Sequence, residues 1–587
     1  MDPRLRRFSR PLPVLLAVSA LALAARLVAL GARVAHQDEG RVADWILHYM
    51  TVGQWQYRPI IHGPFLPHVN GVVFSWFGAT DFTMRLVVAV GGGLLPLAAY
   101  LYRDRLRDDE VIAFGLLLAA SPALLYYSRF MRNDLLVAAC MMAALGCWSR
   151  AHATRRVRYV IAGTLPFALA FTMKENALLY PVAWLGAGVL VIDRHLLAAA
   201  LSDRGFVASV AGTVERWGRA VEARTAGAFL LSLAAALLCF LVVVVAFYAP
   251  IPEVYGVFGS PGSFVHVIET ATVDTWHAFV DTWAHTGMSS HSTVDFLGRL
   301  LKILGLTATV TCTFALVGFV RERYGRGGTR NLVEFCFYWG AASIFGYAVV
   351  TDILAGWLAT HVVAPLALPA AVGLAWVYRV GKRGYASGDR IAFRLAAAVL
   401  LVSAAGVGGT AVYTSYAAPQ DGETNPLVQY AQPAGQMKPT LAEIETVAET
   451  NDGIDVMFYG EEFYNANDLE EPPTLNIGSG GYQGWFARLP LPWYFDRYGA
   501  RVGSTTEQDV LADRQPPVVI ALEGTADDVR ASIDTSAYTE RTYQGYQSGR
   551  PLVFFVRDDA SAGEVNATSM AGAANVGSTT NASTASA

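Results

Sequence analysis

A series of apolar segments, each long enough to cross a bilayer, constrains this chain more than any other feature. A transmembrane helix needs about 20 predominantly apolar residues. Charged residues make up only 16% of the chain, against roughly 25% in soluble proteins. The sequence therefore predicts a mainly α-helical, polytopic membrane protein and excludes a string of soluble domains. We count eleven candidate spans, at 12–34, 82–102, 110–128, 133–149, 158–173, 177–193, 226–249, 300–320, 331–351, 361–379 and 391–413.

The charges are unevenly divided along the 587 residues. From Tyr413 onward the chain holds 9 Lys and Arg against 24 Asp and Glu, a balance of −15, and the preceding part has a balance of +11. These parts therefore belong in different environments. We predict a transmembrane domain at 1–413 with interfacial outer loops at about 36–80 and 250–299, an extracytoplasmic soluble α/β domain at 414–557, and a disordered Ala/Ser/Thr-rich tail at 558–587.

The distribution of Lys and Arg between the loops predicts the orientation. Cytoplasmic loops carry an excess of these residues. With the N-terminus inside, arginine-rich loops at 103–107, 150–158, 194–224, 321–330 and 379–390 all lie on the cytoplasmic side. We expect a cytoplasmic N-terminus and, because the number of spans is odd, an extracytoplasmic C-terminal domain. Two glycosylation sequons, at Asn566 and Asn581, are consistent with that side.

The C-terminal domain has the patterns of both strands and helices. Apolar runs at 454–460, 516–522 and 551–557 predict strands, and the spacing at 440–450 and 525–533 predicts helices. The aromatic, Pro-broken stretch 485–499 is better suited to an interface or a membrane-facing loop than to a regular element.

Polar residues gather at the outer ends of the spans, where charge is costly and therefore a functional candidate. His36-Gln37-Asp38-Glu39-Gly40-Arg41 follows the first span. The two carboxylates can act as a base or bind a hydroxyl or a metal, and Arg41 can bind a phosphate. A solvated loop with an ion pair is the alternative. His62 lies in the interfacial loop and is a further candidate for the site. The alternative is that this histidine has only a structural role.

Two further groups end at the same side. Arg129, Arg132 and Asp134 lie between the third and fourth spans. Snorkelling arginines and a carboxylate placed by the helix dipole are the alternatives there. Lys174 is one of four lysines in the chain and lies between two apolar runs. We interpret it as a phosphate ligand, and pairing with the adjacent glutamate is the alternative. His361 enters the tenth span from this side.

A metal ion is an open question, and the cofactor is unknown. Asp274, His277, Asp281 and His285 have spacings that place them on one helical face. We regard His277, Asp281 and His285 as weak candidates for a divalent metal, and the polar face of an interfacial helix is the alternative.

Motifs that occur in this order along the chain are the Asp38-Glu39 pair with Arg41, "HGPFLP", "SRFMRNDLL" and "MKENALLYP". On these motifs the chain resembles the GT-C superfamily of lipid-phosphate-sugar-dependent glycosyltransferases. Protein O-mannosyltransferases and lipid A aminoarabinose transferases belong to it. With "GWLATHVVAPLALP" and "LPWYF", the chain is most similar to the archaeal flippase-activity-associated family of N-glycosylation gene neighbourhoods. An acidic-Lys-Pro motif of the aminoarabinose transferases is replaced here by His62-Gly63-Pro64.

The resemblance implies an inverting enzyme that transfers a sugar from a polyprenyl- or dolichyl-phosphate donor to a protein or glycan acceptor. It implies Asp38, with Glu39, as the catalytic carboxylates. Binding of lipid phosphate and sugar is expected from Arg41, Arg129, Arg132, Asp134, Lys174, His62 and His361. The alternatives are a flippase or flippase-associated protein without transferase activity, and an inactive scaffold. Membrane lipid is an expected partner, and nucleic acid is not.

Overall fold

The computed structural model describes residues 11–200, 223–283, 292–325, 329–351, 353–429, 432–466, 468, 484–545 and 550–559. The chain forms two compact units, Met1–Gly435 and Gln436–Ala587. The domain boundary predicted at residue 413 stays a prediction, although the segment 414–435 makes its contacts with the first unit.

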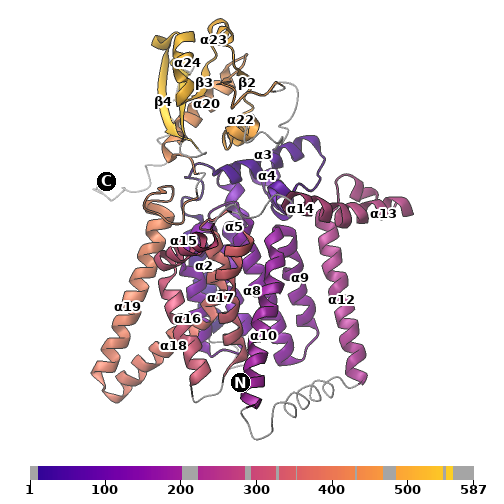
Figure 1. The fold of residues 1–587 in the computed structure, drawn as a ribbon, viewed down its shortest axis with the longest axis vertical. Coiled ribbons are helices and arrows are strands. Elements are labelled where there is room, and N and C mark those ends of the chain that lie inside the picture. Colours follow the sequence, from indigo (N-terminus) through magenta and orange to yellow (C-terminus); the bar gives the residue numbers. More distant parts are fainter. Residues whose placement is uncertain are drawn as a thin grey trace, which may run out of the picture. The chain divides into compact units, whose positions relative to one another are not determined.

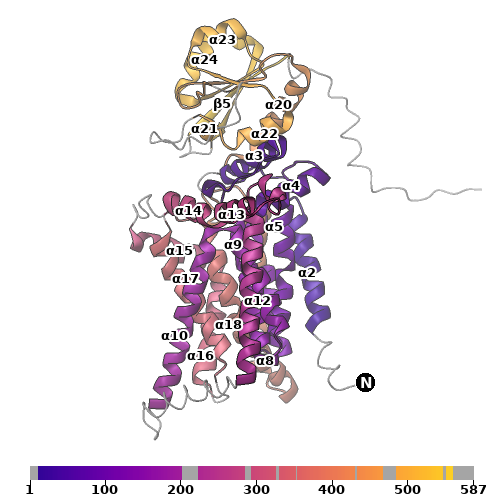
Figure 2. The ribbon, with the colours of Figure 1, turned by 90° about the vertical axis from the view of Figure 1, so that its right-hand side faces the viewer.

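The first unit is a bundle of long helices, with shorter helices lying across one end of it (Figures 1 and 2). The long helices run side by side, whereas α13 and α14 lie across their ends in both views. The helices are α2 (Pro11–Leu27), α3 (Gln37–Val52), α4 (Phe65–Phe77), α5 (Thr83–Leu94), α6 (Asp108–Ala120), α7 (Pro122–Tyr127), α8 (Asn133–Thr154), α9 (Arg158–Met173), α10 (Leu179–Ala200), α12 (Ala223–Tyr248), α13 (Pro261–Glu269), α14 (Thr275–Trp283), α15 (Thr293–Thr307), α16 (Thr309–Tyr324), α17 (Asn331–Val350), α18 (Leu358–Ser387) and α19 (Arg390–Val412).

The predicted number of eleven spans is not confirmed. Among the described residues, seven helices are long and apolar enough to cross a membrane, or eight if α15 and α16 together form one bent span. The angle between α15 and α16 is 94°, so the predicted span 300–320 is interrupted. The predicted span 110–128 is divided into α6 and α7 at Ser121–Pro122, because proline cannot donate a helical hydrogen bond. α2 and α9 are apolar but shorter.

Helix α18 lies at the centre of the bundle. Every residue from Leu358 to Gly373 is buried, and most of them are small or aliphatic. Small residues let neighbouring helix backbones approach closely. At Gly318 of α16, a Cβ atom would collide with the Pro369 carbonyl oxygen of α18. The packing of α16 against α18 therefore depends on glycine at this position.

The loop predicted to be interfacial, 36–80, contains α3 and α4. His36 caps the start of α3. Its Nδ1 accepts a hydrogen bond from the Asp38 N–H at 3.0 Å, while Glu39 Oε2 accepts one from the His36 N–H at 3.0 Å. This reciprocal capping fixes the first turn of α3. Gly53, at φ 70°, ends the helix.

The second unit is an α/β domain built on a five-stranded sheet of order β2-β1-β3-β5-β4. β1 is parallel to β2 and β3, while β5 is antiparallel to β3 and β4. The predicted strands and helices correspond to β1, β3 and β5 and to α20 and α24. The elements are α20 (Lys438–Thr450), β1 (Val456–Tyr459), α21 (Trp485–Arg488), α22 (Leu491–Tyr498), β2 (Val502–Thr505), α23 (Gln508–Arg514), β3 (Val518–Leu522), α24 (Ala526–Ser532), β4 (Tyr538–Gln544) and β5 (Pro551–Arg557).

The aromatic stretch 485–499 is helical, so the prediction that it is not a regular element is wrong. It forms α21 and α22, and Trp493, Tyr494 and Phe495 are all buried. Phe495 packs against Phe458 of β1, with ring centroids 6.0 Å apart. Phe495 therefore packs against the sheet of this domain. The sequons at Asn566 and Asn581 and the predicted disordered tail lie outside the described residues, apart from Asp558 and Asp559 at the start of the tail.

We predict that Gly318→Ala lowers the apparent melting temperature of the detergent-purified protein. The added methyl group cannot be accommodated without moving α16 from α18, and overpacking of this kind costs about 1–3 kcal/mol. Gly346→Ala is the matched control, because a Cβ atom there meets nothing within 4 Å. Equal melting temperatures for the two variants would contradict the close packing.

Candidate active site

Charged side chains from four parts of the first unit meet at one end of the bundle. They come from the start of α3, the turn before α8, the turn between α9 and α10, and the start of α18. Six of the residues predicted from the sequence join in one connected set. These are Asp38, Arg41, Arg132, Asp134, Lys174 and His361.

Asp38 is held by two arginines. Arg41 Nη2 donates to Asp38 Oδ1 at 2.8 Å, and Arg132 Nη1 donates to Asp38 Oδ2. Burial raises the pKa of the Asp38 carboxyl, but Arg41 and Arg132 outweigh this effect and hold the pKa well below its usual range. The side chain is 15% exposed. Asp38 is therefore an ionised carboxylate that remains partly exposed.

The neighbouring carboxylate, Glu39, is in a different environment, because its side chain is fully buried. Arg85 donates from Nε and Nη2 at 2.8 Å each, Arg33 Nη2 donates at 3.1 and 3.2 Å, and the Met131 N–H donates at 2.8 Å. Both oxygens are engaged by the protein. A catalytic role for Glu39 stays a prediction, and these contacts favour a role in positioning α3.

Asp134 is the centre of a second buried group. Lys174 Nζ donates to its two oxygens at 2.9 and 3.1 Å, and Arg132 Nε lies 3.4 Å from Oδ2. His361 Nε2 lies 3.1 Å from Oδ1. Since Arg132 contacts both Asp38 and Asp134, it connects the two carboxylates. The site thus holds three cations between two carboxylates.

His361 does not line an open surface, because its side chain is fully buried. Its Nδ1 lies 2.5 Å from the Tyr180 hydroxyl, and its ring stacks on Tyr347 with centroids 5.0 Å apart. The structure therefore places His361 beneath Asp134, where it orients this carboxylate. Binding of sugar or phosphate by His361 stays a prediction.

The wall of the site beside Lys174 is formed by the loop that contains His62. His62 Nδ1 lies 3.1 Å from Glu175 Oε2, and the Tyr57 hydroxyl donates to Glu175 Oε1 at 2.8 Å. The Gly63 N–H donates to the Met173 carbonyl at 3.1 Å. Burial lowers the pKa of His62, so its ring is neutral at pH 7. The alternative pairing of Lys174 with Glu175 is not what the structure shows, since Lys174 bonds Asp134.

Arg129 points away from the connected set. Its guanidinium donates to the carbonyl oxygens of Arg26, Val28 and Ala29 at 2.6–3.1 Å, around the end of α2. Helix ends leave carbonyl groups without internal partners, and Arg129 satisfies them here. Phosphate binding by Arg129 stays a prediction that these contacts do not favour.

The structure adds two residues that the sequence did not identify. Trp357 lies under the cations, with Arg132 Cζ 3.7 Å and Lys174 Nζ 5.7 Å from its ring centroid. Gln429 Oε1 lies 3.4 Å from Arg132 Nη1, and its buried Nε2 has no partner among the described residues. Trp357 lies in the motif "GWLATHVVAPLALP", but a tryptophan just before a span is usually an interfacial anchor, so the sequence suggested no role in the site. No motif contains Gln429.

The metal candidates are only partly described. His277 and Asp281 lie on α14, while His285 is outside the described residues. Within the described ranges, no three His, Cys, Asp or Glu side chains are grouped closely enough to hold a metal ion.

Two parts of the chain match known family models. Residues 61–214 match the dolichyl-phosphate-mannose-protein mannosyltransferases, and residues 437–558 match the Agl23 flippase-associated protein C-terminal domain. These matches confirm the predicted resemblance in the membrane unit and in the second unit. No curated protein sequence matches the chain.

Solved structures share the fold at low sequence identity. ArnT from Cupriavidus metallidurans bound to undecaprenyl phosphate has a TM-score of 0.56 and 16% identity, covering 93% of this chain and 98% of that chain. Its apo state has a TM-score of 0.56 and 15% identity, with the same coverage. The Archaeoglobus fulgidus oligosaccharyltransferase tethered with an acceptor peptide has a TM-score of 0.47 and 13% identity, covering 90% of this chain and 72% of that chain.

The fold is thus that of the GT-C class of membrane glycosyltransferases. The chain is a multi-pass membrane protein with a C-terminal α/β domain, as predicted. The chain combines a segment similar to the mannosyltransferases with a C-terminal domain similar to that of the Agl23 flippase-associated protein.

We predict that Glu39→Gln destabilises the protein far more than Asp38→Asn does. Removing one partner of a buried ion pair costs about 3–5 kcal/mol, because the remaining charge is left uncompensated. Here Arg33 and Arg85 would lose their carboxylate, whereas Asp38 is partly exposed and Arg132 keeps Asp134. Thermal unfolding in detergent measures the difference, and similar losses in the two variants would contradict a positioning role for Glu39.

Proposed function

We propose that this protein transfers a sugar from a polyprenyl- or dolichyl-phosphate donor to a protein or glycan acceptor, with inversion at the anomeric carbon. The observation that carries the proposal is the geometry of Asp38. It is an ionised, partly exposed carboxylate placed among three cations at one end of a membrane bundle. A base for the acceptor and a binding site for an anionic donor therefore lie side by side.

The three cations are suited to bind the phosphate of the donor. Arg41 and Arg132 can offer paired N–H groups to phosphate oxygens, and Lys174 adds a point charge. As the sugar–oxygen bond breaks, negative charge grows on the departing lipid phosphate. Cations that are already in place stabilise this charge without rearranging. Trp357 holds the Arg132 guanidinium from below and so limits its movement.

Asp38 would accept the proton of the attacking hydroxyl group. In the free protein its two guanidinium contacts make it a weak base. A donor phosphate competes for the same guanidinium groups, and each contact that Asp38 loses raises its pKa. Binding of the donor thereby makes Asp38 a stronger base when the acceptor is to be activated.

The orientation follows from the loop charges. We place the N-terminus in the cytoplasm and the α/β domain outside, so that transfer takes place on the outer face of the membrane. The match of residues 437–558 to a flippase-associated protein favours a second candidate, the movement of a lipid-linked sugar across the bilayer without a new glycosidic bond.

The two candidates differ in their product. Purified protein in proteoliposomes would receive radiolabelled dolichyl-phosphate hexose, with and without an acceptor. A labelled acceptor supports the transferase, and translocated donor without labelled acceptor supports the flippase. If neither donor movement nor product is found, both candidates are wrong and the scaffold interpretation stands.

Asp38→Asn is expected to lower the transfer rate by about a hundredfold to ten-thousandfold, the usual contribution of a general base. The matched control is Glu253→Gln, which neutralises an exposed carboxylate in the loop after α12. Initial rates with labelled donor measure the effect. Retained transfer by folded Asp38→Asn would refute this assignment.

Arg41→Gln is expected to shift the acidic limb of the pH–rate profile to higher pH. Arg41 holds the pKa of Asp38 down, so its removal raises that pKa and the base becomes protonated at a higher pH than in the wild type. Arg41→Lys keeps the charge and should shift the limb less. Arg41→Gln should also raise the KM for the donor, because one contact with the donor phosphate is lost. An unchanged profile would show that Asp38 is not the titrating base.

A further inference from the structure

A second charged pocket lies at the opposite end of the bundle from Asp38. Helix α18 connects the two sites, since His361 lies beneath Asp134 and Arg379 lines the second pocket. Eighteen residues separate these positions along the helix, which corresponds to about 27 Å at 1.5 Å per residue. This distance is close to the thickness of the apolar layer of a bilayer. The pocket therefore lies at the other membrane surface.

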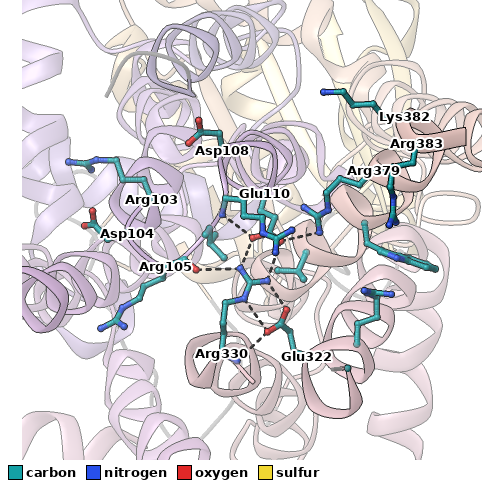
Figure 3. Close-up of a pocket in the computed structure, with 16 residues that line it drawn as sticks. Arg103, Asp104, Arg105, Asp108, Glu110, Glu322, Arg330, Arg379, Lys382 and Arg383 are labelled. Carbon is teal, nitrogen blue, oxygen red and sulfur yellow. Dashed lines mark hydrogen bonds and ion pairs between the residues drawn. The ribbon is translucent and has the colours of Figure 1, made fainter. Parts of the chain in front are cut away.

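The pocket has a volume of about 970 Å³ and an excess of positive charge. Eight Arg and Lys residues and four Asp and Glu residues line it. They come from the segment between α5 and α6, the first turn of α6, the last turn of α16, the residue before α17, and α18. Figure 3 shows Arg330 and Glu110 at its centre, with Lys382 and Arg383 to one side of them.

Two of the four carboxylates of the pocket, Glu110 and Glu322, are engaged by two of its arginines. Arg330 bonds Glu110 at 2.6 and 3.2 Å and Glu322 at 2.7 Å, and Arg379 bonds Glu110 at 3.2 Å (Figure 3). Glu110 is fully buried. This network joins α6, α16 and α18 and is sufficient to explain Arg330 and Arg379 as structural residues.

Of the six other cations, the three on α16 and α18 are not explained in this way. Among the described residues, none of the ion pairs includes Arg321, Lys382 or Arg383, and all three are exposed. Arg321 Cζ lies 4.5 Å from the ring centroid of Trp376, and Arg383 Nε donates to the Arg379 carbonyl at 3.2 Å. Both guanidinium groups are thus held in place with donors to spare.

Charged side chains of a cytoplasmic loop are expected only to face water. Arg321, Lys382 and Arg383 instead line the same cavity. Val372 and Trp376, one turn apart on α18, also line it. Tryptophan is typical of the level of lipid headgroups. Clustered arginines and lysines between transmembrane helices bind the phosphates of anionic headgroups. The cavity thus combines anion-binding groups with an apolar wall.

We propose that this pocket binds a phosphate-bearing anion, either the headgroup of an anionic phospholipid or a soluble di- or triphosphate. Arg321, Lys382 and Arg383 contact the phosphate, and Trp376 packs against the part of the ligand nearest the bilayer. The site is separate from the Asp38 site and does not depend on the proposed sugar transfer.

The test compares three water-soluble probes with the full-length protein in a neutral detergent. The probes are dioctanoyl phosphatidylglycerol, inorganic pyrophosphate and dioctanoyl phosphatidylcholine, and microscale thermophoresis measures their binding. The test variant is the double substitution Lys382→Gln and Arg383→Gln. The matched control is Arg155→Gln with Arg156→Gln, which removes two exposed charges at the same end of the bundle but outside the pocket.

We expect an anionic probe to bind the wild type and the control, and to bind the Lys382/Arg383 variant at least about tenfold more weakly, since each cation near a lipid surface contributes about 1 kcal/mol. Binding of the phosphatidylglycerol alone identifies a lipid, and equal binding of pyrophosphate identifies a soluble anion. The proposal is overturned by equal losses in both double variants, by equal binding of the phosphatidylcholine, or by no binding to the wild type. If the double variant does not fold, Lys382→Gln alone with Arg155→Gln as its control is subject to the same criteria.

Discussion

The buried carboxylate of Glu39 is the interaction on which the site depends. It joins three segments that are far apart in the sequence, because Arg33 precedes α3, Arg85 belongs to α5 and the Met131 N–H belongs to the turn before α8. A fully buried carboxylate must have its oxygens satisfied, so these segments cannot separate without a large cost. Asp38 is the adjacent residue, so the contacts of Glu39 also fix the direction of the Asp38 side chain. The exposed carboxylate is thus positioned by a buried one.

Much of this site could be predicted from the sequence, because charge within a membrane body is rare. Asp38, Arg41, Asp134 and Lys174 stood out among apolar segments, and the structure brings all four together. The sequence could not separate Asp38 from Glu39, since adjacent carboxylates on a helix look equivalent until their partners are known. Arg129 and Arg132 were equally ambiguous. One bonds the carbonyl groups after α2, and the other connects two carboxylates.

Much of the fold could also be predicted from the sequence. Apolar runs identified a helical membrane body and the buried strands β1, β3 and β5, whereas β2 and β4 were not predicted. β4 carries Thr, Glu, Arg and Gln on an edge and lacks an apolar pattern. The stretch 485–499 was misinterpreted because aromatic residues are favoured both at membrane interfaces and in domain cores. Local sequence does not distinguish these two locations. The difference becomes visible only when the sheet against which Phe495 packs is known.

The close approach of Gly63 to the end of α9 has an evolutionary consequence. A Cβ atom at position 63 would collide with the Thr172 carbonyl oxygen, and the Gly63 N–H already bonds the Met173 carbonyl. Lys174 follows directly. Substitutions at position 63 and changes of backbone at 172–174 are therefore not independent. Homologues that place a larger residue in this loop must alter the path of the chain into α10 in the same lineage. The two segments should then covary, although more than a hundred residues separate them.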